Sequence, residues 1–320
     1  MPDPVVRDIA PSTEAFRQAV CAGLAADPKT LPCKFLYDET GARLFEAICT
    51  LDEYYPTRTE LSILMDHAAE MAAALGPRVR LVEPGSGSLQ KVRFLLDHLV
   101  DPVDFVPIDI SLEQLTEEAR QVAVDFPEIA VHPVCADYTA GFALPDVEAE
   151  AQRTVVFFPG STIGNLEPHE AAEFLEKMGE VMGESGAILL GVDLKKDLDV
   201  LHAAYDDPTG VTAAFNRNLL ARINRELGAD LDVSSFEHRA RYEVDPSRMV
   251  LELVSTRDQR ASVAGTEVRF AAGEPIRTEY SHKPSRRDVE DLAAGVGLTV
   301  QRCWMDGRSW FGVFLLERGA

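Results

Sequence analysis

The sequence is poor in cysteine, and its cysteines are not arranged for a metal site or a disulfide framework. The 320 residues include five cysteines, an odd number, and no two of them form a C-x-x-C pair. Zinc sites and disulfide-rich folds use paired cysteines at short, regular spacings. We therefore expect reduced cysteines in the protein core and no bound metal.

Positive charge is also scarce. The chain has 31 lysines and arginines against 53 aspartates and glutamates, which gives a formal net charge of −22. Such an acidic surface repels the phosphates of nucleic acids and the head groups of anionic lipids. We therefore expect neither nucleic acid nor a membrane as a partner. A small zwitterionic substrate and a monomeric protein are the expectations instead.

Long apolar runs are absent as well, because no segment approaches the roughly 20 consecutive apolar residues that span a bilayer. The first four residues, MPDP, lack the basic and apolar regions of a secretory signal, and we expect a cytoplasmic protein. The hydrophobic and charged fractions, 46% and 26%, are typical of a globular protein. The length allows one large domain or two interleaved domains.

The middle of the sequence alternates between strand and helix patterns. Apolar runs typical of buried strands occur near residues 79–84, 103–109, 129–134, 154–158 and 187–193. Helical segments lie between them. A further helix, predicted to start at a T-x-x-E capping box at Thr57–Glu60, precedes the first strand. Such alternation is typical of a parallel sheet with helices on both faces, which binds ligands at the carboxyl ends of its strands.

After about residue 235 the pattern changes to antiparallel strands. The β-rich segments lie near 236–244, 249–255 and 268–270, between turn signals. A final helix from about 285 precedes a hairpin of 298–304 with 310–316, which we expect to return to the first sheet. The sequence therefore predicts an α/β fold with a second, smaller α+β part.

The most informative motif is Leu81–Ser88 (LVEPGSGS), a buried strand that runs into a glycine turn and then a helix. Gly85 and Gly87 let the backbone approach a nucleotide-like ligand, and the helix N-terminus points N–H groups at it. A dinucleotide fingerprint needs a third glycine where Gln90 stands, and a P-loop needs Gly-Lys-Ser/Thr. Glu83 suits a ligand with an ammonium group, such as S-adenosylmethionine (SAM), better than a pyrophosphate. The alternative is a tight turn without a ligand.

Acidic residues after the next two strands extend this hypothesis. Asp109 ends the second strand, where it is placed to accept hydrogen bonds from ribose hydroxyls. The alternative for Asp109 is a helix cap, but Ser111 and Gln114 are predicted to form the capping box themselves. Asp137, after the third strand, is a candidate for the adenine amino group or a solvated loop acid. The cofactor residues expected are Glu83, Gly85, Ser86, Gly87, Lys91, Asp109, Asp137 and Tyr138.

Five further blocks, spread over the chain, resemble the SAM-dependent histidine Nα-methyltransferases of ergothioneine biosynthesis. The blocks are Tyr37–Gly41 (YDETG) with Phe45, Glu53–Arg58 (EYYPTR), Phe158–Leu166 (FPGSTIGNL), Ala204–Asp206 (AYD) leading to Gly210–Asn216 (GVTAAFN), and Ile276–Lys283 (IRTEYSHK). The resemblance implies a class I (Rossmann-like) methyltransferase domain of residues 60–194 plus 285–320. It also implies a substrate-binding domain of residues 10–59 plus 195–284, with substrate between the two.

The resemblance also implies roles for individual residues. Tyr54 and Tyr205 match positions that hold the substrate carboxylate, and Asn165 matches the position that holds the α-amine. Glu279 and Ser281 match positions that hold the imidazole, and Tyr37 and Phe45 match positions that line the pocket. Asn165 and Tyr37 are the expected catalytic residues. Gly85, Lys91, Asp109 and Asp137 match cofactor positions. Leu251 stands where the family pattern has methionine, which weakens the prediction of selectivity for histidine.

Elementary chemistry supports the role of Asn165. Methyl transfer from a sulfonium needs a neutral amine lone pair held in line with the methyl group, and it needs no strong base. An asparagine oxygen accepts a hydrogen bond from the amine without adding a charge that would retain the ammonium form. The alternative is a loop asparagine in the left-handed conformation beside Gly164.

Other residues of the blocks also have a functional and an ordinary interpretation. Glu279 and Ser281 are two residues apart in a predicted strand, so both face one side. Without the resemblance, the residue pattern favours an exposed strand face that carries Glu and Ser. Lys91 is either a cofactor contact or a solvated lysine. We expect transfer of three methyl groups to the amine of histidine. The alternatives are a methyltransferase for another amino acid and a non-catalytic SAM-binding module.

Overall fold

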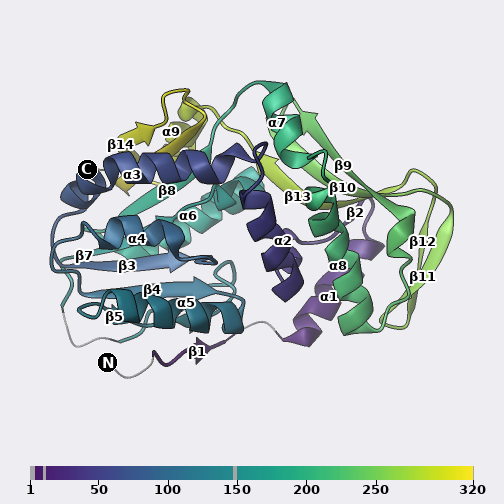
Figure 1. Ribbon diagram of the computed structural model, residues 1–320, viewed down its shortest axis with the longest axis horizontal. Helices are drawn as coiled ribbons and strands as arrows, with labels where there is room; N and C mark the ends of the chain where they lie inside the picture. Colours follow the sequence, from purple (N-terminus) through teal and green to yellow (C-terminus); the bar gives the residue numbers. More distant parts are fainter. Residues whose placement is uncertain (1–3, 10–11, 147–149, 320) are drawn as a thin grey trace. The chain divides into compact units, whose positions relative to one another are not determined.

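The computed structural model describes residues 4–9, 12–146 and 150–319. The described residues form two compact units, each drawn from separate parts of the chain (Figure 1). Unit 1 comprises the segments Met1–Ala10, Pro56–Leu194 and Pro284–Ala320, and unit 2 comprises Pro11–Tyr55 and Lys195–Lys283.

Unit 1 is built on a nine-stranded sheet. Its strand order is β1-β6-β4-β3-β7-β8-β15-β14, with the short β5 beside β4. All pairings are parallel except the last two, in which β15 runs antiparallel to both β8 and β14. The strands are β1 (Arg7–Asp8), β3 (Val79–Pro84), β4 (Asp104–Asp109), β5 (Ala130–Val131), β6 (Val134–Cys135), β7 (Arg153–Phe158), β8 (Ala187–Asp193), β14 (Leu298–Met305) and β15 (Phe311–Arg318). This arrangement confirms the predicted α/β class and the C-terminal hairpin.

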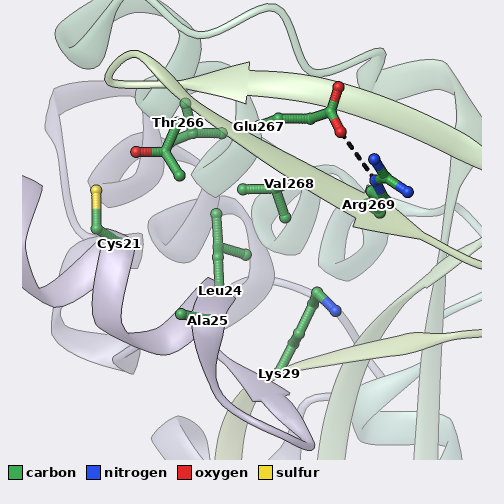
Figure 2. A pocket seen from close by; sticks show the side chains of 9 residues that line it. Cys21, Leu24, Ala25, Lys29, Thr266, Glu267, Val268 and Arg269 are labelled. Atoms are coloured by element: carbon green, nitrogen blue, oxygen red, sulfur yellow. Dashed lines mark hydrogen bonds and ion pairs between the residues drawn. The ribbon is translucent and has the colours of Figure 1, made fainter.

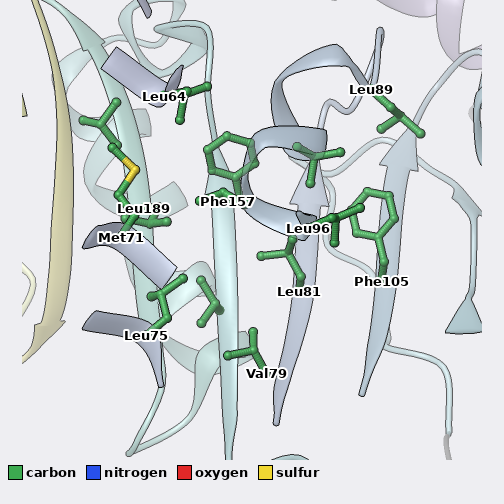
Figure 3. Close-up of a cluster of buried hydrophobic side chains, with 14 of the residues drawn as sticks. Leu64, Met71, Leu75, Val79, Leu81, Leu89, Leu96, Phe105, Phe157 and Leu189 are labelled. Carbon is green, nitrogen blue, oxygen red and sulfur yellow. The ribbon is translucent and has the colours of Figure 1, made fainter. Parts of the chain in front are cut away.

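Helices cover both faces of this sheet because its central strands are apolar on both sides. Val155 and Phe157 of β7 point into one hydrophobic cluster, whereas Val156 and Phe158 point into another. Figure 3 shows the first cluster, in which side chains of α3 and α4 pack onto β3, β4, β7 and β8. The helices of unit 1 are α3 (Tyr55–Leu75), α4 (Gln90–Leu96), α5 (Leu112–Asp125), η2 (Thr162–Asn165), α6 (Pro168–Met182) and α9 (Arg286–Gly295).

Two predictions of element boundaries in unit 1 are wrong. The expected strand 129–134 is two short strands, β5 and β6, because Pro133 between them has no N–H to donate to a ladder. The helix expected to start after Thr57 already begins at Tyr55, so Glu60 lies inside α3 and is not a capping residue. The Glu60 side chain is buried.

Unit 2 contains a four-stranded sheet of order β2-β13-β10-β9 and a separate β11–β12 hairpin. Strand β10 is antiparallel to both of its neighbours, as the sequence predicted for this region. The strands are β2 (Lys29–Thr30), β9 (Phe236–Glu243), β10 (Arg248–Ser255), β11 (Gln259–Val263), β12 (Thr266–Phe270) and β13 (Pro275–His282). The helices are α1 (Thr13–Ala25), η1 (Cys33–Leu36), α2 (Glu39–Cys49), α7 (Leu198–Tyr205), α8 (Val211–Leu227) and η3 (Val233–Ser235).

The core of unit 2 lies between its helices and its sheet. Side chains of α1 and α8 meet those of β9, β10 and β13 in one hydrophobic cluster. All five cysteines are thiols in the structure. Within the described ranges, no helix has the length and apolar character that a membrane crossing requires.

Candidate functional site

The glycine turn of unit 1 connects β3 to α4 in a conformation that only glycine adopts readily. Gly85 and Gly87 have φ angles of +68° and +43°, in the left-handed region. The ring of Tyr138 lies directly over the turn, because a Cβ atom added to Gly85 would be 3.2 Å from its Cε1 atom. Tyr138 is itself held by edge-on contacts with Phe158 and Phe174, at centroid distances of 5.7 and 5.9 Å.

Asp109 fastens this turn to the end of the neighbouring strand. Its Oδ2 atom accepts a hydrogen bond from the Gly87 N–H at 3.0 Å, and its Oδ1 atom accepts one from the Ser111 N–H at 2.9 Å. Burial raises the pKa of Asp109, and these backbone hydrogen bonds partly oppose the rise. The predicted capping box is wrong, because the side chain of Ser111 makes no cap hydrogen bond. The Ser111 N–H donates to Asp109 instead of to the predicted partner Gln114. Each carboxylate oxygen still has a second lone pair for a ligand hydroxyl.

Two buried polar atoms of the turn have no partner among the described residues, namely Oε2 of Glu83 and Oγ of Ser86. Glu83 is only 1% exposed. Burial raises its pKa well above the usual value, the charge of Lys91 opposes this rise, and the charges of Glu60 and Asp109 add to it. An unpaired buried carboxyl group is costly. A ligand ammonium would supply the missing partner, so the residues present fit the amino-acid end of SAM.

Lys91 is not a solvated lysine. Its ammonium lies 2.6 Å from Oε2 of Glu60, a side chain with no exposed surface. Both carboxylate oxygens of Glu60 accept the Gly160 N–H, at 2.9 and 3.0 Å. Gly191 leaves the room for this carboxylate, since a Cβ atom there would lie 2.4 Å from Glu60 Oε1. Glu60 is not recognisable as a site residue from the sequence, because a T-x-x-E pattern is also typical of a helix start.

The remaining cofactor candidate, Asp137, accepts hydrogen bonds from the N–H and the hydroxyl of Thr139 at 2.9 and 2.5 Å. It therefore stabilises the turn that carries Tyr138 after β6. This position at the carboxyl end of the sheet agrees with a ligand contact, but its hydrogen bonds alone are those of an ordinary loop aspartate.

Asn165 ends η2, the short helix that follows β7. Asn165 does not have a positive φ, so its interpretation as a left-handed loop residue is wrong. The left-handed positions of this loop are Gly160 and Ser161, with φ of +81° and +60°. Ser161 is held in place by accepting the Asp193 N–H on its hydroxyl at 2.9 Å. The half-buried side chain of Asn165 makes no hydrogen bond with any residue that the structure describes. Its amide is consequently available to a ligand.

In unit 2, Glu279 and Ser281 share the buried face of β13. They are 8% and 3% exposed, so the interpretation as an exposed strand face is wrong. Leu251 pairs directly with Glu279, and Met249 pairs with Ser281, which places all four side chains on one face. A register shift between Leu251 and Glu252 ends this regular pairing.

Tyr205, the last residue of α7, joins this face. Its phenol oxygen lies 2.8 Å from Ser281 Oγ, and both oxygens accept hydrogen bonds from the ammonium of Lys283, at 2.7 and 2.6 Å. Lys283 belongs to the Ile276–Lys283 block, but it is not among the site residues expected from the sequence. No local pattern identifies it, because a lysine near a strand end is usually solvated.

Aromatic rings continue from Tyr205 in an unbroken series. Tyr54 meets Tyr205 at a centroid distance of 6.2 Å, Phe45 meets Tyr54 at 6.2 Å, and Tyr37 meets Phe45 at 5.4 Å. Phe215 of α8 contacts Tyr37 and Phe45 and is the one ring of the series that the sequence analysis left without a role. Burial raises the pKa of Tyr54 well above its usual value, and the neighbouring Tyr205 adds to this rise. The phenol of Tyr54 therefore stays neutral.

Glu279 is the acidic group of this arrangement. Burial raises its pKa from 4.5 to about 7, and the charge of Lys283 opposes the rise. No hydrogen bond or ion pair reaches its carboxylate from the residues that the structure describes. Glu279 therefore presents an unpaired acceptor beside a hydroxyl and several rings, which suits a flat heteroaromatic ligand with an N–H group.

A pocket of unit 2 involves none of the expected residues. Figure 2 shows it beside α1, β2 and the β11–β12 hairpin, with Leu24 and Val268 on its walls. Its two cationic side chains already have partners, since Lys29 pairs with Glu274, and Arg269 pairs with Glu267 at 2.8 Å. This pocket offers no group for the expected chemistry.

Comparisons with known proteins agree with these observations. The sequence profile of a family described as "Histidine-specific methyltransferase, SAM-dependent" matches residues 16–318. The chain is 43% identical to the histidine N-alpha-methyltransferase of Mycolicibacterium smegmatis over 313 residues, which are 96% of either chain. It is 32% identical to ergothioneine biosynthesis protein 1 of Neurospora crassa, over 91% of this chain and 33% of that protein.

A solved structure resembles the chain in fold alone. A possible exported protein from Bordetella parapertussis superposes with a TM-score of 0.51 and 11% identity, over 87% of this chain and 79% of that one. The family profile, in contrast, spans nearly the whole sequence, and its SAM dependence agrees with the unpaired carboxyl of Glu83 beside the glycine turn. The chain therefore belongs to the family of histidine-specific, SAM-dependent methyltransferases.

Proposed function

We propose that this protein transfers methyl groups from SAM to the α-amine of L-histidine. Three successive transfers give histidine betaine (hercynine), with S-adenosylhomocysteine as the other product. The observation that carries this proposal is the buried pair Glu279 and Ser281 on one strand face, in a chain that is 43% identical to a histidine N-alpha-methyltransferase over almost its full length. The name of the Neurospora crassa relative supports a place in ergothioneine biosynthesis.

The residues around the glycine turn are proposed to hold the cofactor. Glu83 would accept hydrogen bonds from its ammonium, and Asp109 would accept them from the ribose hydroxyls. Gly85, Ser86 and Gly87 would bring backbone and a hydroxyl close to it. Lys91 is proposed to approach the methionine carboxylate while Glu60 holds it, and Asp137 and Tyr138 are proposed to contact the adenine. When bound, SAM supplies an electrophilic methyl group on a positively charged sulfur.

The residues of unit 2 are proposed to hold histidine. Glu279 would accept the imidazole N–H, and Ser281 would donate to the other ring nitrogen. Tyr54 and Tyr205 would bind the carboxylate through their phenol groups, which are neutral donors. Tyr37 and Phe45 would line the pocket with their rings, and Leu251 would pack against the imidazole. Leucine has nearly the volume of methionine, so this departure from the family pattern should leave room for histidine.

The mechanism needs orientation rather than a strong base. In the first two transfers, Asn165 would accept a hydrogen bond from the amine N–H through its amide oxygen, which aims the nitrogen lone pair at the methyl group. In the third transfer the neutral amine has no N–H left, so the contacts of the carboxylate and the ring would hold the nitrogen in line. The N–C bond forms as the C–S bond breaks, and the positive charge passes from sulfur to nitrogen. After each of the first two transfers the ammonium loses a proton to solvent, which restores the lone pair. The third transfer gives a quaternary nitrogen and ends the series.

The direct test is mass spectrometry of the purified protein incubated with histidine and SAM. We expect masses that correspond to one, two and three added methyl groups, together with S-adenosylhomocysteine. If a different amino acid is methylated in a mixture of all twenty, that amino acid is the substrate and histidine is not. Binding of SAM without any methylated product would identify a non-catalytic module instead.

A variant tests the assignment of the imidazole contacts. Glu279→Ala should weaken histidine binding by about 1–3 kcal/mol, the cost of losing a charged hydrogen-bond partner. Its SAM affinity should stay close to that of the wild type, because Glu279 belongs to unit 2 and the proposed SAM contacts belong to unit 1. Calorimetry of both ligands measures the two effects separately, and unchanged histidine affinity would remove Glu279 from the site.

A further inference from the structure

Glu60 is a glutamate with no exposed surface, and it joins three segments of unit 1. It belongs to α3, and its Oε2 atom lies 2.6 Å from the ammonium of Lys91 on α4. Its two oxygens also accept the N–H of Gly160, in the loop after β7, at 2.9 and 3.0 Å. A buried carboxylate is costly unless an opposite charge and hydrogen bonds compensate it. Lys91 and Gly160 supply both.

The atoms around this carboxylate are closely packed. A Cβ atom added to Gly191 of β8 would lie 2.4 Å from Glu60 Oε1 and 3.2 Å from the Gly160 nitrogen. A Cβ atom added to Gly160 would lie 3.2 Å from Nζ of Lys91. The ammonium, the carboxylate and the loop backbone are therefore in mutual contact, so a movement of one of them displaces the others.

The loop that Glu60 holds also carries Asn165. Gly160 and Ser161 are consecutive left-handed residues, with φ of +81° and +60°, and this conformation is unfavourable for serine. The turn therefore depends on its side-chain contacts. The hydroxyl of Ser161 accepts the Asp193 N–H at 2.9 Å, and Glu60 accepts the N–H of Gly160. Helix η2 begins with the next residue and ends at Asn165, so the position of Asn165 depends on this turn.

The ammonium of Lys91 can bind a ligand while it stays paired with Glu60. An ammonium has three N–H donors, and Glu60 is its one partner among the described residues. The side chain of Lys91 is 18% exposed, so the remaining donors are accessible. A ligand carboxylate at this point would meet an ammonium that is already fixed in place.

We propose that Glu60 is a positioning residue that couples the cofactor site to the loop of Asn165. Lys91 engages the methionine carboxylate of SAM, Glu60 is held more firmly as a result, and the turn at Gly160 is fixed with it. This inference rests on the proposed function, because it takes that carboxylate as the ligand of Lys91 and Asn165 as the group that orients the amine. The amine acceptor then becomes ordered when a complete cofactor is bound.

Hydrogen exchange at the Gly160 amide tests the coupling directly. S-adenosylhomocysteine carries the amino-acid end of the cofactor, whereas 5′-methylthioadenosine keeps the adenine and the ribose and lacks that end. At saturation, S-adenosylhomocysteine should slow the exchange of the Gly160 N–H in the wild type, and 5′-methylthioadenosine should leave it close to that of the ligand-free protein. Equal slowing by both ligands would overturn the proposal.

The variant Glu60→Gln separates coupling from direct shielding of the amide. Its amide oxygen can still accept the Gly160 N–H, but the uncharged side chain no longer holds the ammonium of Lys91. S-adenosylhomocysteine should therefore not slow the exchange at Gly160 in this variant. If the slowing persists, the bound ligand shields the amide itself, and the proposal is wrong.

Binding affinities test whether the effect passes through Lys91. A released lysine has to be ordered when the ligand binds, which costs about two- to tenfold in affinity. In calorimetry, Glu60→Gln should weaken SAM and S-adenosylhomocysteine by this factor and leave 5′-methylthioadenosine unchanged. In a Lys91→Met background, Glu60→Gln should cause no further loss, and a further loss would show that Glu60 acts by another route. This double variant buries no unpaired charge, so it remains usable if a single variant does not fold.

Asp66→Asn is the matched control, since it removes a negative charge from an exposed position of the same helix. Its three affinities and its exchange at Gly160 should equal those of the wild type. A wild type that binds SAM and methylates no histidine would refute the proposed function, whereas the exchange and affinity measurements would still decide the role of Glu60. A wild type that binds neither SAM nor S-adenosylhomocysteine would refute both.

Discussion

The burial of Glu279 leads to a stability prediction that does not depend on catalysis. Folding raises the pKa of this carboxyl from 4.5 to about 7, and each pKa unit corresponds to about 1.4 kcal/mol. Below about pH 4.5 the carboxyl is protonated in the folded and the unfolded chain, and it costs nothing. The cost grows as the pH rises from 4.5 to 7, and above that it amounts to about 3 kcal/mol of lost unfolding free energy.

The substitution Glu279→Gln keeps the shape of the side chain and removes this cost. In the ligand-free protein, the unfolding free energy at about pH 8 should increase by up to ~3 kcal/mol. The gain should fall below ~1 kcal/mol at about pH 5, where the wild-type carboxyl is mostly protonated. Lys283 loses its balancing charge in the variant, so the measured gain should lie below the upper limit. Urea unfolding followed by circular dichroism at the two pH values measures both differences.

Glu267→Gln is the matched control, since it removes the same charge from an exposed strand position in unit 2. The pKa of Glu267 is lowered by its hydrogen bond with Arg269, so this substitution should bring no gain at high pH. The reasoning is refuted if Glu279→Gln is less stable than the wild type at about pH 8. It is equally refuted if the gain is the same at both pH values.

Three further predictions concern the cofactor, the reaction and the packing. Asp109→Ala should weaken SAM and S-adenosylhomocysteine alike in calorimetry, since both carry the ribose, and unchanged affinities would remove Asp109 from the site. Wild-type kcat/KM should rise with pH toward the pKa of the substrate ammonium, about 8–9. The variant Asn165→Asp should bind histidine at least as well and react slowly. If the pH profile is instead set by a pKa near 6–7 that disappears on mutating one side chain, a protein group acts as the base. Gly191→Ala should lower Tm because its Cβ would lie 2.4 Å from Glu60 Oε1. Gly179→Ala should not lower it, because a Cβ added at this helical position would meet no atom within 4 Å outside the neighbouring backbone of its own helix.

The sheet of unit 1 could be predicted because each strand is recognisable from the residues of that strand alone. The apolar runs that became β7 and β8 alternate between two hydrophobic clusters, residue by residue, and such runs are readable wherever both faces of a strand are buried. The boundaries were less predictable. Tyr55 and Pro56 extend α3 backwards past Thr57, since proline is well tolerated in the first turn of a helix.

The supporting residues of the two units could not be predicted in the same way. Glu60 and Lys91 are far apart from Gly160 in the sequence, and only the folded sheet brings the three together. Lys283 is close to Ser281 in the sequence, but its contact with Tyr205 joins residues 78 positions apart. A sequence pattern shows which residue types are present, whereas burial of a charge depends on contacts between distant segments.

Two of the acids that the sequence indicated, Glu83 and Glu279, share a physical property. Glu83 and Glu279 are both buried with raised pKa values, and neither carboxyl is fully satisfied within its own unit. A chain with 53 acidic residues has ample exposed positions for such groups. Two glutamates retained in buried sites therefore reduce the stability of the ligand-free protein, and a bound ammonium and a bound ring N–H would each restore part of it. Ligands that pair with these acids should stabilise the fold most strongly above pH 7, where the unpaired charges cost the most.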